Sequence, residues 1–271
     1  MSTHHTPGEL KVKIKVAAGL IETRTHEGDD TIVEIEPLDD RESSRQAVEK
    51  AREELRGGEL MIEVPEQSRF GFRGGDAQVR VTVDAPKGAH INTRTASADA
   101  RLLGDLGSID GASASGALFA ERVAGDVAFK TASGDLSVEG IGRDANLNTV
   151  SGDVRVGSVG GRASVKLVSG DVEIGQAGGD VRVDSVSGDA ALRAVSRGET
   201  SVKSVSGDIK VGVVAGTKVW LDVNSMSGDT RSDLDPSDAP ETKDGESLRL
   251  KATSTSGDVR ISRAASAAPA G

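Results

Sequence analysis

The stretch that decides the fold runs from Ser151 to Ser169 and reads SGDVRVGSVGGRASVKLVS. It begins and ends on the serine of a Ser-Gly-Asp triplet, and the two serines are 18 residues apart. Further triplets begin at Ser133 and Ser187, also in steps of 18, and then at Ser206, Ser227 and Ser256, in steps of 19, 21 and 29 residues. Degenerate copies begin upstream at Ser97 and Ser115. Such self-similarity indicates a repeat architecture in which each unit buries its apolar face on the next.

The 18-residue unit divides into two halves of nine residues. Small apolar residues occupy places three, five and eight of each half: Val154, Val156 and Val159 in one, and Ala163, Val165 and Val168 in the next. Places three and five share one face of a strand, and place eight is predicted to point inward after a bend. The pattern predicts an all-β protein, a parallel β-solenoid (β-helix) with 18-residue coils. A hexapeptide β-helix is excluded because its apolar residues would recur every six positions.

The Gly-Asp pair of each triplet is predicted to form a corner of the coil. Glycine adopts the positive φ of a corner at little cost, and aspartate can accept backbone N–H bonds there. The carboxylates would stack as a ladder of Asp135, Asp153, Asp171, Asp189 and Asp208. A divalent cation could relieve their repulsion, but calcium-binding nonapeptides place aspartate two residues beyond a glycine, and here it follows directly. Corner capping is therefore the prediction, and no metal ligand is assigned.

Residues 1–96 are predicted to form a strand region that caps the repeat, because apolar and polar residues alternate in segments such as Leu10–Val16. One helix, about residues 43–56, is predicted there, with a capping box of Ser43 and Gln46 and an end at Gly57-Gly58. The solenoid would span residues 97–262, with an acidic loop over 232–246, and residues 263–271 would be a disordered tail.

Composition restricts the function. The chain has no cysteine, which excludes disulfides and thiolate sites, and a net charge of −10, which disfavours nucleic acid and anionic lipid as partners. No stretch is apolar enough for membrane insertion. The first 18 residues interleave lysines with apolar residues, unlike a signal peptide, so a cytoplasmic location is expected.

The sequence contains no G-x-S-x-G, P-loop or H-E-x-x-H motif for catalysis or cofactor binding. The histidines, His4, His5, His26 and His90, are scattered; His4 and His5 could chelate a metal, but their position at the chain end favours an incidental pair. Trp220 is interpreted as a core or cap residue near the end of the repeat rather than a ligand platform. No catalytic, cofactor-binding or metal residue and no cofactor is therefore predicted.

Three features resemble a known family: the Ser-Gly-Asp corner followed by an aliphatic residue, the segment Val219–Ser225, and the closing segment Ala252–Ile261. They are similar to bacterial β-strand-repeat proteins labelled putative adhesins, domain of unknown function 4097. The resemblance implies a β-solenoid fold and no agreed activity. Some relatives are tied to cell-envelope stress responses, so it also permits a regulatory or scaffold role.

We predict a non-enzymatic interaction scaffold with an unidentified protein partner, adhesin-like in fold, that does not bind nucleic acid. The oligomeric state stays open. Two alternatives come from other classes: a carbohydrate-active β-helix enzyme using an acid pair such as Asp153 and Asp171, or an acidic mimic of nucleic acid. The enzyme would need a cleft with converging carboxylates, and the mimic a surface of phosphate-spaced acids.

Overall fold

The computed structural model describes residues 1–65, 77–234 and 247–264. Most of the predicted loop over 232–246, and the predicted tail from residue 265 onward, lie outside the described residues. The chain forms two compact units, residues 1–138 and 139–271. In both units nearly all regular structure is β-strand, which confirms the all-β prediction. The predicted boundary between residues 96 and 97 remains a prediction.

In the first unit the strands are β1 (Ser2–His5), β2 (Lys11–His26), β3 (Asp30–Pro37), β4 (Arg52–Arg56), β5 (Glu59–Glu63), β6 (Val79–Pro86), β7 (His90–Leu106), β8 (Ser108–Ser115), β9 (Leu118–Val123), β10 (Val127–Ser133) and the start of β11 (Leu136–Ile141). β2 pairs with β7 in parallel, β7 pairs with β8 and β9, and β8 pairs with β10. Parallel pairing therefore already includes β2, which carries no Ser-Gly-Asp triplet.

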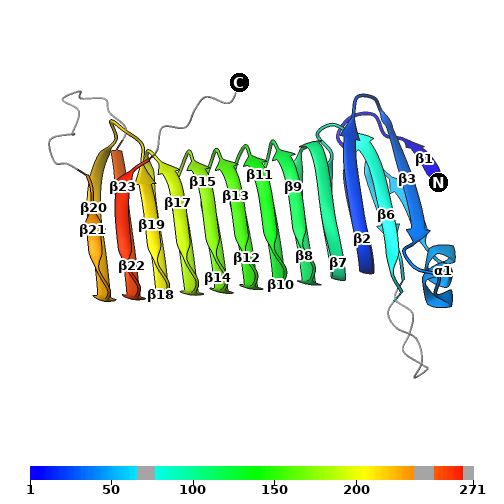
Figure 1. Ribbon diagram of the computed structural model, residues 1–271. Helices are drawn as coiled ribbons and strands as arrows, with labels where there is room; N and C mark the ends of the chain where they lie inside the picture. The colour runs from blue at the N-terminus through cyan, green and yellow to red at the C-terminus, as the bar shows by residue number, and fades with distance from the viewer. Residues whose placement is uncertain (66–76, 235–246, 265–271) are drawn as a thin grey trace. The chain divides into compact units, whose positions relative to one another are not determined.

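The remaining strands of the first unit cover the outer side of β2 (Figure 1). β5 pairs with the first half of β2 and β6 with its second half, both in parallel. Antiparallel strands follow outward, β4 on β5, and β3 and then β1 on β6. The helix α1 (Glu42–Glu49) packs against β3 and buries Ala47. Antiparallel pairing and a helix thus lie on the outer side of the parallel strands of this unit, and a capping role for the region stays a prediction.

The predicted helix over residues 43–56 is too long. α1 ends at Glu49, and Arg52–Arg56 forms β4, which is joined to β5 by the hairpin turn Gly57-Gly58. Both glycines have positive φ, +56° and +81°, as a two-residue hairpin turn requires. The predicted capping box is wrong as well, because Arg41 is the N-cap residue and has no side-chain hydrogen bond to the helix. Gln46 instead donates to the Glu42 carboxylate over 2.9 Å.

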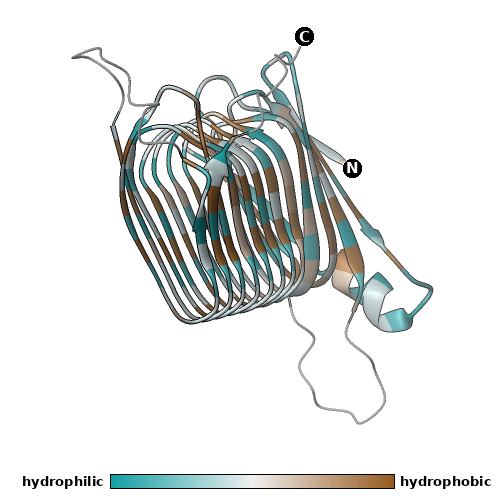
Figure 2. Ribbon diagram, turned by 60° about the vertical axis from the view of Figure 1, so that its left-hand side comes forward, coloured by the Kyte–Doolittle hydropathy of each residue, from teal (hydrophilic) through white to brown (hydrophobic). Residues whose placement is uncertain are grey.

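In the second unit the strands are β12 (Ala145–Ser151), β13 (Val154–Val159), β14 (Ala163–Ser169), β15 (Val172–Ala177), β16 (Val181–Ser187), β17 (Ala190–Val195), β18 (Gly198–Ser206), β19 (Ile209–Val213), β20 (Lys218–Ser227), β21 (Thr230–Ser232), β22 (Ser247–Ser256) and β23 (Val259–Arg263). Among the described residues of this unit, even-numbered strands pair with even-numbered strands and odd-numbered with odd-numbered, in parallel. We call these two rows of strands the even face and the odd face. Figure 2 shows turns of chain lying one behind another.

The last coils of the second unit do not follow chain order. β22 lies between β18 and β20, and β23 lies between β19 and β21 (Figure 1). Ser256 is therefore in register with Ser206 on one side and Ser227 on the other. The chain places its outermost described coil first and then returns to fill the gap. β20 is consequently an edge strand, and its residues are more exposed than those of β22.

The core of the second unit is a set of aliphatic columns, and most of the predicted inward residues are confirmed. Val154 stacks on Val172 and Val156 on Ile174, and all four are buried. Place eight is inward on the odd face, where Val159 is buried. On the even face this prediction is wrong: Leu167, at place seven, is buried, and Val168 is exposed. β14 alternates without a bend from Ala163 to Val168, so places three, five and seven face the core and places four, six and eight face outward.

Candidate functional site

The mispredicted residues form a column on the even face. Val150, Val168, Val186 and Val205 precede the serine of successive triplets on β12, β14, β16 and β18. Each is between 48% and 52% exposed, although valine is favoured in protein interiors. Since Ser151, Ser169, Ser187 and Ser206 are in register, the preceding valines stand beside one another, one coil apart. We call these four residues the valine column.

The surroundings of the valine column are polar and of mixed charge. Two residues earlier on each strand stand Asn148, Lys166, Asp184 and Lys203, which are also in register. Past the column lies the corner, where Thr149 Oγ1 donates to the Ser151 carbonyl over 3.1 Å. The column is thus a narrow apolar strip between polar rows. Thr255 of β22, which precedes Ser256, continues it with a polar residue of similar shape.

At the corner, the aspartates of the triplets bind the backbone. The Asp153 carboxylate accepts a hydrogen bond from the N–H of Asp171 over 3.0 Å. In the next two coils, the Asp171 carboxylate accepts from the N–H of Asp189, and the Asp189 carboxylate accepts from the N–H of Asp208, both over 2.8 Å. The prediction of corner capping is confirmed, with one difference: each carboxylate caps the next coil rather than its own. The ladder continues through Asp258 to Asp229 in spatial order. These oxygens are engaged in holding successive corners together.

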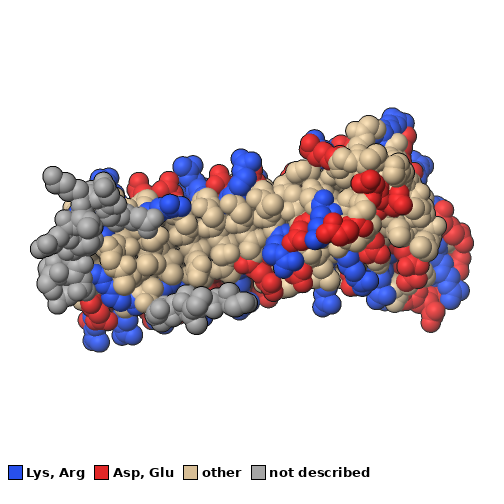
Figure 3. All heavy atoms as spheres, turned by 90° about the horizontal axis from the view of Figure 1, so that it is seen from above, with Lys and Arg blue, Asp and Glu red and all other residues tan. Residues whose placement is uncertain are grey.

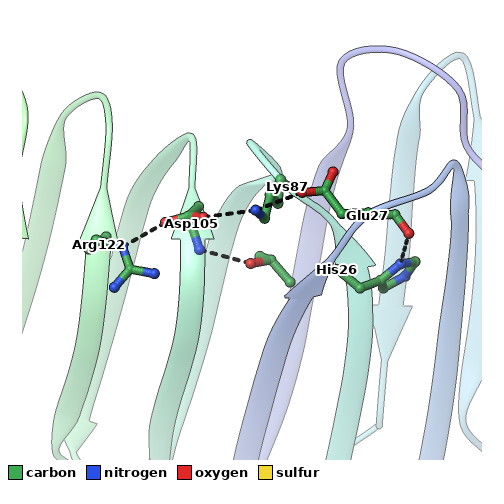
Figure 4. A network of polar contacts seen from close by, with 6 residues as sticks. His26, Glu27, Lys87, Asp105 and Arg122 are labelled. Atoms are coloured by element: carbon green, nitrogen blue, oxygen red, sulfur yellow. Dashed lines mark hydrogen bonds and ion pairs between the residues drawn. The ribbon is translucent and has the colours of Figure 1, made fainter.

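In the first unit, a chain of ion pairs links the ends of three coils (Figure 4). Lys87, in the turn after β6, lies 2.8 Å from Glu27 and 3.4 Å from Asp105, and Arg122 Nε donates to Asp105 over 2.6 Å. Hydrogen bonds from Arg122 and then Lys87 lower the pKa of the Asp105 carboxyl. Hydrogen bonds to Glu27 and Asp105 raise the pKa of Lys87. The network joins the turns that follow β2 and β6 to β7 and β9.

The structure separates the four histidines. His4 lies 3.2 Å from Glu53, His5 2.9 Å from Asp30, and His90 2.7 Å from the Ser108 hydroxyl, while His26 bonds backbone carbonyls. His4 and His5 point to opposite sides of β1, which pairs with β3. Over residues 1–65, 77–234 and 247–264, no group of three or more histidine, aspartate or glutamate side chains is arranged to hold a metal ion.

Trp220 is not a core residue. It lies on the edge strand β20, is 65% exposed, and has the Arg249 guanidinium 5.5 Å from its ring centroid. The contact is a cation–π pair between neighbouring strands at the end of the even face.

α1, eight residues long, is far too short to cross a membrane, and the described part of the chain offers no other helix that could.

Three solved structures are similar to this chain at low identity. A putative adhesin from Bacteroides fragilis is 14% identical, with 96% of this chain and 95% of that one covered and a TM-score of 0.45. A putative lipid binding protein from Parabacteroides distasonis is 13% identical, with coverage of 96% and 95% and a TM-score of 0.33. A putative cell adhesion protein from Clostridium sporogenes is 10% identical, with coverage of 94% and 92% and a TM-score of 0.25. No curated protein sequence matches the chain.

These comparisons contradict the cytoplasmic location expected from the sequence. Similar structures are described as putative adhesins or as a putative cell adhesion protein, not as cytoplasmic proteins. The expectation rested on the lysines among the first 18 residues, which in the structure belong to β2, a strand of the fold. The expected cytoplasmic location is therefore wrong.

The resemblance seen in the repeated corner and the closing segments is confirmed over almost the whole chain. The model of the family described as Toastrack DUF4097 matches residues 10–263, and the chain belongs to that family.

Proposed function

We propose that this protein is a non-enzymatic interaction protein and that the valine column on the even face contacts a partner protein. The observation that carries the proposal is the half exposure of four successive valines at one register position. Apolar residues scattered singly over a surface are ordinary, whereas a contiguous apolar strip rimmed by polar residues is typical of an interaction surface. The strip runs straight over four coils, which suits an extended or flat partner.

Strand propensity alone does not account for the valines. A β-branched side chain stacks well on its equivalents in neighbouring strands, and threonine provides the same branching with a polar atom. A threonine stands next to the column for comparison, because Thr255 occupies the same register position in β22. Keeping valine in four coils leaves apolar surface in water at positions where threonine would fold equally well. Covering that surface in a complex would contribute favourably to binding.

A binding role agrees with the state of the acidic residues. An acid–base pair of Asp153 and Asp171 would need a free carboxylate facing a substrate, but each of these groups accepts a backbone N–H of the next coil. Asp153 also pairs with Arg155 over 2.7 Å. These residues serve the fold, which favours the scaffold over the carbohydrate-active enzyme. The mixed charges beside the valine column favour it over the nucleic-acid mimic as well.

Photo-crosslinking tests the proposal. A photoreactive amino acid is placed at Val168 in the column, or at Ser164 on the same strand four residues earlier, and the native host cells are irradiated. We expect Val168 to yield one discrete protein adduct and Ser164 to yield little. Replacing Val150, Val186 and Val205 by threonine should reduce the adduct at least several-fold, because the fold is kept and the apolar strip is lost.

The matched control changes the neighbouring row on the same strands, Lys166→Gln and Lys203→Gln, and should leave the adduct in place. An adduct that forms equally from Ser164, or that survives the three threonine substitutions unchanged, would overturn the proposal. So would the lack of any adduct from a folded protein carrying the probe at Val168.

A further inference from the structure

The odd face of the second unit carries a groove of about 870 Å³ on its outer surface. Its floor is built from small residues, Gly157, Gly175, Ala191, Ala194 and Gly212. The glycines are required by the packing of the coils. A Cβ on Gly175 would lie 2.3 Å from the Gly157 carbonyl oxygen, and one on Gly212 would lie 2.1 Å from that of Arg193. The backbone here approaches the neighbouring coil closely, which leaves a hollow where side chains would otherwise stand.

The walls of the groove are positively charged. Arg193, Lys210, Arg260 and Arg263 line it, and no aspartate or glutamate is among its described lining residues. This contrasts with the chain as a whole, whose net charge is −10. Arg193 is paired with Glu173, outside the lining, over 2.5 Å. Lys210 and Arg260 have no hydrogen-bond or ion-pair partner among the described residues, so their charges are available to a ligand.

The two unpaired cations are direct neighbours. Lys210 of β19 is in register with Arg260 of β23, and Arg260 is in register with Arg231 of β21 on its other side. Like charges opposite one another in adjacent strands destabilise a sheet. The order of the coils places Arg260 of β23 beside Lys210 of β19. Arg231 lies on the outer strand β21, where it pairs with Asp229 over 3.2 Å. An anionic ligand spanning the coils would remove this repulsion.

We propose that this groove binds a linear polyanion of the glycopolymer class, a chain of sugar or polyol units with regularly spaced phosphate or carboxylate groups. Lys210 and Arg260 lie on neighbouring coils, roughly 4.8 Å apart, and Arg193 and Arg263 line the same groove, so a polymer with repeated charges can contact more than one cation at once. The small residues of the floor admit the polymer backbone closely. Nucleic acid fits less well, because the described lining residues include no aromatic side chain on which bases could stack. The site is on the opposite face from the valine column and does not depend on it.

Binding of defined polymers to the full-length protein tests the proposal. Isothermal titration calorimetry at low salt uses poly(glycerol phosphate) as the phosphodiester probe and polygalacturonate as the carboxylate probe, with neutral dextran and a single-stranded oligonucleotide for comparison. We expect one or both acidic polymers to bind and dextran not to bind. The one that binds more tightly identifies the anionic group. Binding should weaken with salt, as expected for a polyelectrolyte.

The double variant Lys210→Gln, Arg260→Gln should weaken binding of the acidic polymer by at least tenfold and lower the slope of log K against log salt by roughly 0.7 per charge removed. The control, Lys166→Gln with Lys203→Gln, removes the same charge from the even face and should leave binding nearly unchanged. Four results would overturn the proposal: no binding of either acidic polymer, equal binding of dextran, tighter binding of the oligonucleotide, or equal losses in the two double variants.

Discussion

Replacing Gly188 by alanine tests how the corners hold the coils together. Gly188 has a φ of +121°, a region that residues with a side chain rarely adopt. A Cβ built on it would lie 2.0 Å from the carbonyl oxygen of Gly170 and 3.1 Å from the Asp171 carboxylate. Two costs therefore add in this variant, backbone strain at Gly188 and displacement of the neighbouring coil.

The strain is worth about 1–3 kcal/mol, and forcing an atom into a well-packed contact costs about 1–3 kcal/mol more. We expect Gly188→Ala to lose about 2–6 kcal/mol of unfolding free energy. Gly216→Ala is the matched control, because Gly216 also has positive φ, +82°, but nothing lies within 4 Å of its Cβ position. It should lose only the strain of a left-handed residue, about 1–2 kcal/mol.

Urea unfolding followed by far-UV circular dichroism measures both variants, and the difference in midpoint reports the clash separately from the strain. The neighbouring hydrogen bond from Asp189 N–H to the Asp171 carboxylate should also weaken in Gly188→Ala, which hydrogen exchange at Asp189 would show. Equal midpoints for the two variants would refute the reasoning, because close contact between coils would then contribute nothing to stability.

Three further predictions concern the core, the corner and the ion pairs of the first unit. Val156→Asp should cost several kcal/mol and prevent folding at 37 °C, since Val156 is buried, whereas Arg155→Gln should lose at most about 1 kcal/mol in a thermal melt because its ion pair is exposed. Asp171→Ala should lose about 1 kcal/mol in urea unfolding and Asp171→Asn much less, because asparagine keeps the acceptor; millimolar calcium should raise the melting temperature of neither. The pKa of Asp105 is lowered on folding, so the stability that its carboxylate contributes is present above about pH 3.9 and is lost as the pH falls through the folded value. The difference in melting temperature between wild type and Asp105→Asn should therefore close in acid. A difference that persists at about pH 2 would contradict this.

The sequence predicted the coil because the period of the side chains and the period of the triplets agree. Val154 and Val156 had to share a face, and residues 18 positions later had to stack on them. The helix was predicted too long for an identifiable reason. Gly57-Gly58 ends a helix as well as it turns a hairpin, and only the pairing of Leu55 with Leu60 distinguishes the two. That pairing depends on the neighbouring strand β2, which the local sequence does not reveal.

The exposed valines were missed because both halves of the unit were treated as equivalent. Val159 follows a bend and points inward, whereas Val168 ends a straight strand and points outward. The residue types of the two halves differ in a way that could be used. Gly157 interrupts the alternation of apolar and polar residues in one half, whereas Lys166 followed by Leu167 continues that alternation in the other half. A separate alignment of the two halves would have placed Val168 on the surface.

The order of the last coils could not be predicted from the triplets, because Ser227 and Ser256 satisfy the register with Ser206 equally well. The residue composition of β20 and β22 explains which of the two strands lies at the edge. β22 supplies Leu248, Leu250 and Ala252 to a position enclosed on both sides, and all three are buried. β20, with Trp220 and Asp222 on its outward side, is placed at the edge, where fewer of its side chains need to be covered. Burying the more apolar strand is the favourable order.

Alternation of inward and outward residues along each strand explains how the 18-residue repeat can carry two different outer surfaces, the valine column on the even face and the basic groove on the odd face. The inward residues alone fix the coil, as the buried pairs Val154 with Val172 and Val156 with Ile174 show. The outward residue between them, Arg155 in one coil and Glu173 in the next, varies in charge without a change in register. Stability and recognition therefore rest on separate residues of the same strand. It follows that outward substitutions in the valine column or the basic groove should change binding while unfolding free energy stays nearly constant, and that inward ones should do the reverse.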